Sequence, residues 1–123
     1  MASARRGGYR QRLGARGEQL VAEWYVARGY RVVARNWRCR EGEIDLVLWS
    51  RRADLVFCEV KTRSSARFGL PVEAVTPTKR QRLRVLATRF LAADDGSLAG
   101  RAGLRFDVAS VTAGRVEVIE AAF

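Results

Sequence analysis

Histidine is absent from the 123 residues of this sequence, and cysteine occurs only at positions 39 and 58. The lack of imidazole excludes catalysis by a histidine base and the common zinc sites. Cys39 and Cys58 lie too far apart for a C-x-x-C redox pair or a paired metal ligand. Any bound metal would therefore have to be a hard cation held by oxygen atoms.

Long hydrophobic runs are also missing, because no segment approaches the roughly 20 apolar residues of a membrane span. The N-terminal sequence MASARRGGYRQR is charged and lacks the apolar core of a secretory signal. We expect residues 1–12 to form a flexible basic tail, with a short arginine-rich transit peptide as the alternative. Cys58 lies in the apolar run LVFCEV, which predicts a reduced core residue. A cytoplasmic protein with no membrane partner is expected.

Lysine is scarce as well: of the 23 basic residues only Lys61 and Lys79 are lysine, and the formal net charge is +10 at pH 7. The planar guanidinium of arginine can donate two parallel hydrogen bonds to a phosphate. A genomic preference for arginine would explain the choice of residue but not the surplus of charge. The composition therefore favours a polyanionic partner, with nucleic acid ahead of an acidic membrane.

The hydrophobic fraction of 48% and the chain length predict one folded domain. Hydrophobic periodicity predicts a helix over residues 13–28, whose apolar side would carry Leu13, Gly17, Leu20, Val21, Trp24 and Ala27. Thr76 as N-cap and Pro77 predict the start of a second helix, with Leu83, Leu86, Ala87 and Phe90 as its buried stripe.

Strands are predicted within residues 30–38, at 43–50 and 53–61, and at 104–112 and 115–121, with a turn at Ala113 and Gly114. Residues 63–75 form a polar loop that contains glycine and proline. The fold class expected from this order, α-β-β-β-α-β-β, is α/β (α+β), with a mixed β-sheet flanked by helices.

The stretch GEIDLVLWSRRADLVFCEVKTR, residues 42–63, alternates like two strands of a hairpin. A turn near Arg52 would place Val47 opposite Phe57 and Asp45 opposite Glu59. One face would be wholly apolar, formed by Ile44, Leu46 and Leu48 with Val56, Cys58 and Val60. The other face would be apolar near the turn and charged at its far end.

Two carboxylates facing each other destabilise a sheet, so a positive group should compensate for them. Lys61 and Arg63 are the candidates within the chain, and a divalent cation is the external candidate. Mg²⁺ commonly uses one or two protein carboxylates and completes its coordination with water and phosphate. A structural ion pair between Glu59 and Lys61 is the alternative.

With these residues in place, GEIDLV followed by FCEVKTR resembles the D-x(n)-E-x-K signature of the PD-(D/E)XK nuclease superfamily. Together with GARGEQLVAEWYVARGY, NWRCREGEIDLV and RFDVASV, the chain is similar to the bacterial YraN family, which is related to archaeal Holliday-junction resolvases and RecB-type nuclease domains. The resemblance covers about residues 13–120 and implies a restriction-endonuclease-like core in a nuclease-like domain over residues 13–123. Ile44 stands where the superfamily's name places proline.

The resemblance also implies roles for individual residues. Asp45 and Glu59 would hold Mg²⁺ or Mn²⁺ with the carbonyl of Val60, and Glu18 would complete the acidic cluster. Lys61 would orient or deprotonate the attacking water and stabilise charge on the phosphate. The implied activity is hydrolysis of phosphodiester bonds in DNA, in preference to RNA, with branched or flapped DNA as candidate substrates.

Two alternatives stay open: a non-catalytic nucleic-acid-binding module on the same fold, and a structural protein that binds a partner in the ribosome or a repair complex. A resolvase would need two sites and therefore a homodimer.

Three further basic residues are candidates for nucleic-acid binding. Lys79, near the start of the second helix, would contact phosphate or extend along the edge of the buried stripe. Arg63 would meet the nucleic-acid backbone or order the following loop, and Arg82 would lie on a solvated helix face within reach of phosphate. Asp107 is expected to pair with Arg105 or another arginine rather than to act in catalysis.

Overall fold

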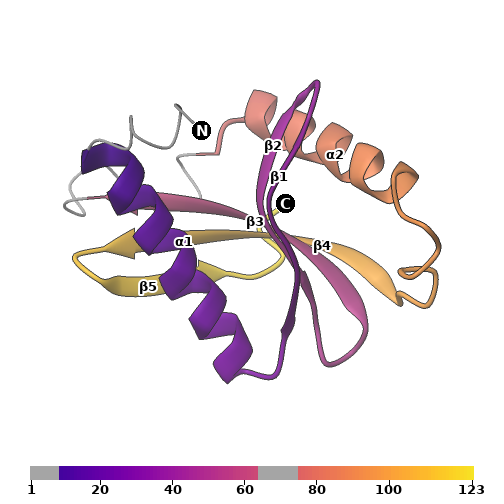
Figure 1. Cartoon of the computed structure of the whole chain (residues 1–123), viewed down its shortest axis with the longest axis horizontal. Helices are drawn as coiled ribbons and strands as arrows, with labels where there is room; N and C mark the ends of the chain where they lie inside the picture. The colour runs from indigo at the N-terminus through magenta and orange to yellow at the C-terminus, as the bar shows by residue number, and fades with distance from the viewer. Residues whose placement is uncertain (1–8, 64–74) are drawn as a thin grey trace.

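The computed structural model describes residues 9–63 and 75–123, which form two helices and five strands in the predicted order (Figure 1). The elements are α1 (Tyr9–Ala27), β1 (Arg31–Cys39), β2 (Gly42–Trp49), β3 (Asp54–Arg63), α2 (Pro77–Ala92), β4 (Gly103–Thr112) and β5 (Arg115–Ile119). The predicted α+β class is confirmed.

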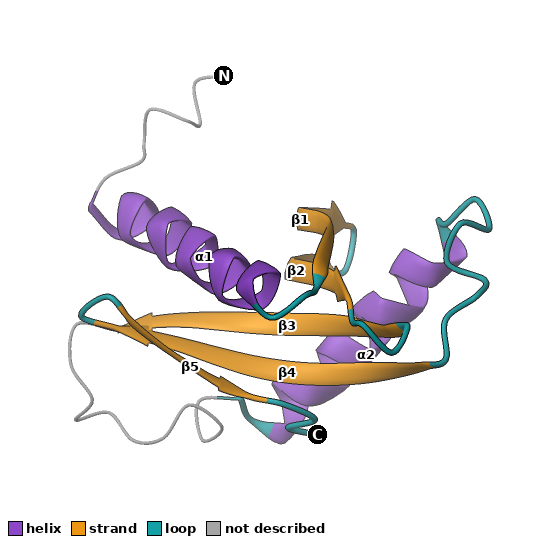
Figure 2. Cartoon of the chain, turned by 90° about the horizontal axis from the view of Figure 1, so that it is seen from below, coloured by secondary structure: helices purple, strands orange, loops and turns teal. Residues whose placement is uncertain are grey.

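The strands form one sheet in the order β1-β2-β3-β4-β5. β3 and β4 are parallel, whereas β1–β2, β2–β3 and β4–β5 are antiparallel. The parallel pair requires a crossover, and α2 lies in the connection between β3 and β4. Figure 2 shows α1 and α2 on opposite sides of this sheet.

A separate hydrophobic core lies under each helix. Against α1, the buried residues are Val21, Ala22, Tyr25, Leu46, Leu48, Val56, Cys58, Ala109 and Val111. Against α2, they include Ile44, Val47, Leu55, Phe57, Leu83, Leu86, Ala87, Phe90 and Val108. β2 and β3 are therefore covered on both faces, which explains why their sequences are almost continuously apolar.

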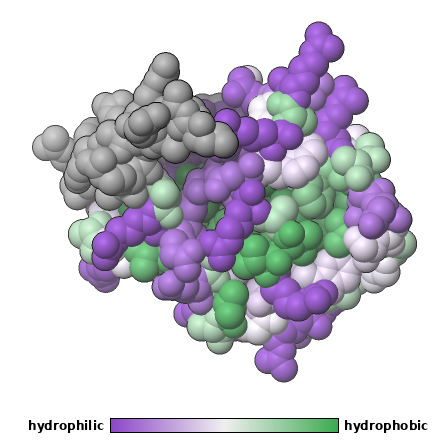
Figure 3. Space-filling model, in the orientation of Figure 1, coloured by the Kyte–Doolittle hydropathy of each residue, from purple (hydrophilic) through white to green (hydrophobic). Residues whose placement is uncertain are grey.

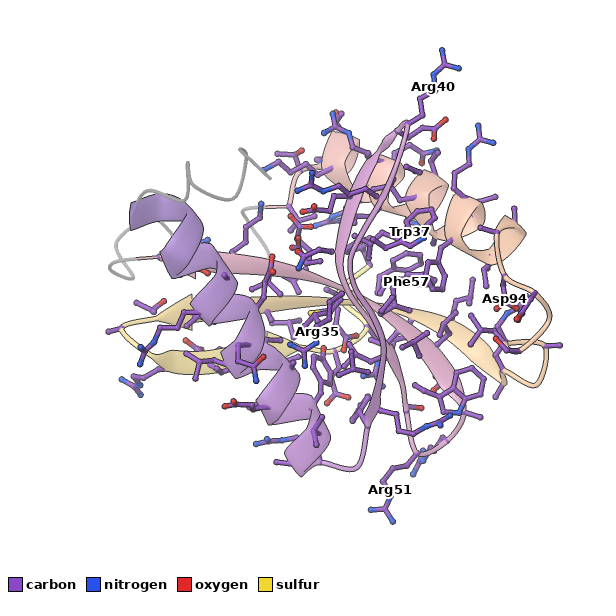
Figure 4. The ribbon with its side chains drawn as sticks, viewed as in Figure 1. Arg35, Trp37, Arg40, Arg51, Phe57 and Asp94 are labelled. Atoms are coloured by element: carbon purple, nitrogen blue, oxygen red, sulfur yellow. The ribbon has the colours of Figure 1, made fainter. Side chains whose placement is uncertain are left out.

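Aromatic contacts hold α2 against the sheet. Trp37 and Phe57 lie on the α2 side of the strands (Figure 4), and both rings meet the ring of Phe90 edge-on, at 5.2 and 5.8 Å between centroids. Edge-to-face pairs of this kind add about 1 kcal/mol each beyond the burial of area.

At the surface, hydrophobic residues gather to the right of the β1–β2 hairpin in Figure 3.

The predicted signals at the ends of elements are confirmed. The side chain of Thr76 accepts a hydrogen bond from the Lys79 amide at 3.2 Å, and Pro77 opens α2. The β4–β5 turn has positive φ at Ala113 (51°) and Gly114 (79°), as a tight hairpin turn requires. No helix within residues 9–63 and 75–123 is long and apolar enough to span a membrane.

Three expectations change. α1 begins at Tyr9, four residues earlier than predicted, so that residues 9–12 of the expected tail are helical; residues 1–8 lie outside the described chain, as do 64–74 of the predicted loop. The buried face of α1 is Gly17, Val21, Ala22 and Tyr25, and Ala27 is exposed. The buried stripe is thus shifted around the helix: Ala22 and Tyr25 are fully buried, whereas the predicted Leu20 and Trp24 are half-buried against the same core.

Ile44 was predicted to share a face with Leu46, and this was wrong: Ile44 packs in the core against α2, whereas Leu46 packs in the core against α1. Ile44 pairs with Trp37 of β1, beyond the last residue of β2 that pairs with β3. β1 changes face at the same level, since Arg35 hydrogen-bonds Gln19 of α1 whereas Trp37 packs in the α2 core. Asn36 between them has a left-handed φ of 49°, which breaks the regular alternation of the β1–β2 ribbon here.

Candidate functional site

The candidate site begins where β2 and β3 separate. Val47 pairs with Phe57, as predicted, and Leu46 with Cys58 is the last pair of this ladder. The same register would next bring Asp45 opposite Glu59. Instead, the Asp45 carboxylate accepts a hydrogen bond from the Val60 amide at 2.8 Å. The side chain thus satisfies a backbone donor of β3 beyond the end of the ladder and is fixed beside it.

The surroundings of the Asp45 carboxyl disfavour its ionised form. Burial, followed by the negative charge of Glu59, raises its pKa to about 7, and the hydrogen bond from Val60 only partly opposes this. Charges on Glu18 and Glu43 act in the same direction as Glu59. The site therefore concentrates negative charge that a cation would neutralise.

Glu18 reaches the site because α1 approaches β3 closely at Gly17. Gly17 is buried, and a Cβ atom there would overlap the Oγ1 atom of Thr62. Burial raises the pKa of Glu18, and the charges of Glu43 and Glu59 add to this effect. A residue larger than glycine at position 17 would move α1, and Glu18 with it, away from the strands.

Asn36 of β1 hydrogen-bonds the Glu18 side chain, which lowers the pKa of Glu18 against the effect of burial. Sequence reasoning missed this residue. Asn36 has a positive φ of 49°, and asparagine adopts this conformation more readily than most residues. An asparagine inside the strand-like run VVARNWR was the available signal.

Lys61 forms an ion pair with Glu59, with 3.0 Å between Nζ and Oε2, and both side chains are mostly buried (25% and 18% exposed). Burial alone would lower the pKa of Lys61, but the charge and hydrogen bond of Glu59 outweigh it and the pKa is raised. Lys61 is therefore protonated at neutral pH. This state suits orienting water and stabilising negative charge, and it does not suit the general base that the resemblance also allowed.

Two of the three basic residues predicted to bind nucleic acid, Lys79 and Arg82, lie near Lys61. Lys79 is exposed and lies close enough to Lys61 for that charge to lower its pKa. The positive charge of Arg82 also lowers the pKa of Lys79, which places Arg82 nearby. Arg63 ends β3, on the same strand face as Lys61. A phosphate contact by each of the three stays a prediction.

The oxygen atoms at this site suit a hard cation, although the protein ligands are few. Within the described ranges, no three acidic or cysteine side chains are arranged to hold a metal ion by themselves. Asp45, Glu59 and the Val60 carbonyl would supply part of a coordination shell, and water or phosphate would complete it. Mg²⁺ commonly binds proteins in this way.

Asp107 lies outside the site and has a structural role, as predicted. It is fully buried, and the guanidinium of Arg105 meets its carboxylate at 2.9 Å. The hydroxyl of Tyr25 donates to the same carboxylate at 2.6 Å, and the Ala121 amide donates at 3.0 Å. The charge is thereby paired and hydrogen-bonded, which a buried carboxylate requires.

Comparison with known proteins places these residues in a family. The model of "Uncharacterised protein family UPF0102" matches residues 17–111, a range that includes Glu18, Asp45, Glu59 and Lys61. A UPF0102 protein of Mycolicibacterium vanbaalenii is 50% identical over 111 residues, which is 90% of this chain and 88% of the relative. One of Nocardia farcinica is 50% identical over 115 residues, covering 92% and 87%. The chain therefore belongs to the UPF0102 (YraN) family.

Proposed function

We propose that this chain is a cytoplasmic, metal-dependent nuclease of the PD-(D/E)XK type, which hydrolyses phosphodiester bonds in DNA. Branched or flapped DNA is the candidate substrate. The observation that carries the proposal is the grouping of Asp45 and Glu59 with a protonated Lys61 where β2 and β3 separate. A net charge of +10 supports a polyanionic substrate.

The cofactor proposed is Mg²⁺ or Mn²⁺, held by Asp45, Glu59 and the carbonyl of Val60. The donor set fits, because these are oxygen atoms and because Asp45 and Glu59 carry mutually repelling charges. When bound, such a cation polarises a phosphoryl oxygen and lowers the pKa of its bound water.

Side chains of the protein would orient the attacking water, stabilise charge and hold the neighbouring phosphates. The ammonium of Lys61 would orient the attacking water and stabilise negative charge that develops on the phosphate. Glu18, held by Asn36, would add to the acidic cluster on the side of α1. Lys79 and Arg82 would hold neighbouring phosphates, because both lie in the first half of α2 near Lys61.

One observation favours the alternative of a nucleic-acid-binding module without catalysis. Lys61 is already engaged by Glu59 at 3.0 Å, as a purely structural ion pair would be. A module of this kind would use the basic surface alone. The two functions differ in whether cleavage depends on Glu59.

The test is cleavage of labelled duplex, flap and four-way DNA with Mg²⁺, with Mn²⁺ and with a chelator. We expect the parent to cleave at least one substrate in the presence of metal, and Glu59→Gln to cleave about 10²-fold or more slowly. Glu117→Gln, which alters an exposed glutamate of β5, is the matched control and should cleave like the parent. Binding of all three substrates without cleavage would overturn the enzymatic proposal and leave the binding module.

A further inference from the structure

A second basic site lies at the far end of β3 from the carboxylates. The β2–β3 turn, the α1–β1 connection, β4 and the segment after β5 line an open pocket of about 310 Å³. Its lining includes Arg28, Arg51, Arg52 and Arg105 together with Tyr30. Asp54 lines this pocket at one end of β3 and Lys61 follows seven residues later. At about 3.3 Å per residue, Lys61, which would contact the phosphate at the carboxylate site, is about 23 Å from Asp54 along β3.

The arginines of this pocket exceed its carboxylates, Asp54 and Glu120. Arg105 is occupied, since it contacts Asp107 at 2.9 Å and Glu120 at 3.2 Å. In the part of the chain that the structure describes, Arg28, Arg51 and Arg52 form no ion pair with a carboxylate. The pocket therefore keeps positive charge for a ligand.

Two of these arginines are positioned by the protein. The guanidinium of Arg28 lies over the ring of Trp24 at 3.7 Å and donates to the Trp24 carbonyl at 3.0 Å. The side chain of Arg51 lies where a Cβ atom on Gly29 would be, and Gly29 has a φ of 90°. Arg51 then extends from the end of the hairpin into solvent (Figure 4).

The turn that carries Arg51 and Arg52 is also rigid. The hydroxyl of Ser50 accepts hydrogen bonds from the amides of Arg52 (3.2 Å) and Asp54 (2.9 Å). The amide of Ala53 donates to the Ser50 carbonyl at 3.0 Å. An ordered backbone lowers the entropic cost of fixing a ligand.

We propose that this arginine pocket is a second phosphate-binding site, which holds a backbone phosphate of the DNA engaged at the carboxylate site. The identity of the ligand as DNA rests on the proposed function, whereas the preference for phosphate rests on the guanidinium groups. A separation of about 23 Å corresponds to roughly seven base pairs of B-DNA at about 3.4 Å each. Duplexes shorter than this cannot occupy both sites.

The test compares Arg51→Gln/Arg52→Gln with the control Arg31→Gln/Arg101→Gln. The control removes the same charge from exposed arginines that do not line the pocket. Binding of a 20-base-pair duplex and of a hairpin of about six base pairs is measured over a range of salt concentrations. The slope of log affinity against log salt is about −0.9 per phosphate contact.

We expect the pocket variant to bind the long duplex about tenfold or more weakly at low salt, with a slope of log affinity against log salt that is shallower by about 1. Its affinity for the short hairpin should stay within about twofold of the parent. The control variant should lose affinity for the long duplex and the short hairpin to the same extent, and this loss should be smaller than the tenfold loss of the pocket variant. An equal loss for both DNA lengths in both variants would overturn the proposal, because only the overall charge would then matter.

A second arm titrates inorganic phosphate and follows backbone amide resonances. Shifts of Arg51 and Arg52 amides in the parent, absent in the pocket variant, support a phosphate site. If these shifts occur but the affinity for the long duplex is unchanged, the ligand is a free phosphate compound and the DNA assignment is overturned. The nuclease proposal is tested separately by cleavage. If the parent does not cleave DNA but the pocket variant still binds the long duplex more weakly, the nuclease proposal fails and the phosphate site stands.

Discussion

Replacing Asp45 with asparagine should stabilise the metal-free protein at neutral and alkaline pH. The amide oxygen of asparagine can still accept the hydrogen bond from the Val60 amide, which is 2.8 Å from the carboxylate in the parent. The substitution removes the charge that burial and Glu59 disfavour. If Asp45 served only stability, its replacement would lower the free energy of unfolding. A higher free energy of unfolding in the variant would show that the charge of Asp45 destabilises the fold.

The magnitude follows from the pKa of Asp45, which the fold raises from 3.8 to about 7. At about 1.36 kcal/mol per unit the upper bound is roughly 4 kcal/mol, and screening at a partly accessible site reduces it to about 1–2 kcal/mol. The native state holds the Asp45 proton more tightly than the unfolded state does. Ionisation therefore destabilises the parent progressively between about pH 4 and pH 7 and by a constant amount above pH 7.

Thermal unfolding in a chelating buffer at pH 5 and pH 8 is the assay. At pH 8, Asp45→Asn should raise the unfolding midpoint by roughly 5 °C, and at pH 5 the stability gain should shrink to about a third. Asp95→Asn, in an exposed loop, controls for the removal of one negative charge. Mn²⁺ should stabilise the parent and not Asp45→Asn. A variant that is less stable than the parent at both pH values would refute the reasoning.

Three other substitutions test separate parts of the structure. Lys61→Met should fold and bind Mn²⁺ but cleave about 10²-fold or more slowly in single-turnover assays; loss of activity only in proportion to the unfolded fraction would assign Lys61 to a structural ion pair. Gly17→Ala should lower stability to urea by about 1–3 kcal/mol through overlap with Thr62. Gly14→Ala should not, because an added Cβ there would meet no atom within 4 Å apart from its own helix. Adding Thr62→Ala should rescue Gly17→Ala, and equal effects of the two alanines would refute this contact. Tyr25→Phe should lower the free energy of unfolding in urea by about 1.5–3 kcal/mol, since a buried carboxylate loses a donor, and an unchanged midpoint would contradict that role.

The sequence predicted that Asp45, Glu59 and Lys61 would lie close together, because strand alternation and hairpin register are short-range rules. The turn near Arg52 defined the expected register, and its pair Val47–Phe57 is confirmed, whereas Asp45 and Glu59 lie beyond the last pair, Leu46–Cys58. The hydrogen bond from Val60 to Asp45 was not predictable, because alternation does not show where a ladder ends.

Strand alternation could not predict contacts between elements that are distant in the sequence. The approach of α1 to β3 depends on Gly17 meeting Thr62, 45 residues later in the sequence, and the partner of Glu18 depends on the left-handed conformation of Asn36. Ile44 was placed on the wrong face because alternation assumes a regular ribbon, whereas the left-handed Asn36 of β1 lies where Leu46 and Ile44 turn to different cores. The arginine pocket joins four separate segments of the chain and has no sequence motif.

The most direct test of the central claim is a crystal soaked in Mn²⁺ and measured for anomalous scattering. We expect a peak between the carboxylates of Asp45 and Glu59, about 2.0–2.3 Å from their oxygen atoms and adjacent to the Val60 carbonyl. Lys61 should then move away from its 3.0 Å contact with Glu59 or share that carboxylate with the ion. A fully soaked crystal without this peak, in which Lys61 stays paired with Glu59, would contradict the proposed metal site and with it the nuclease.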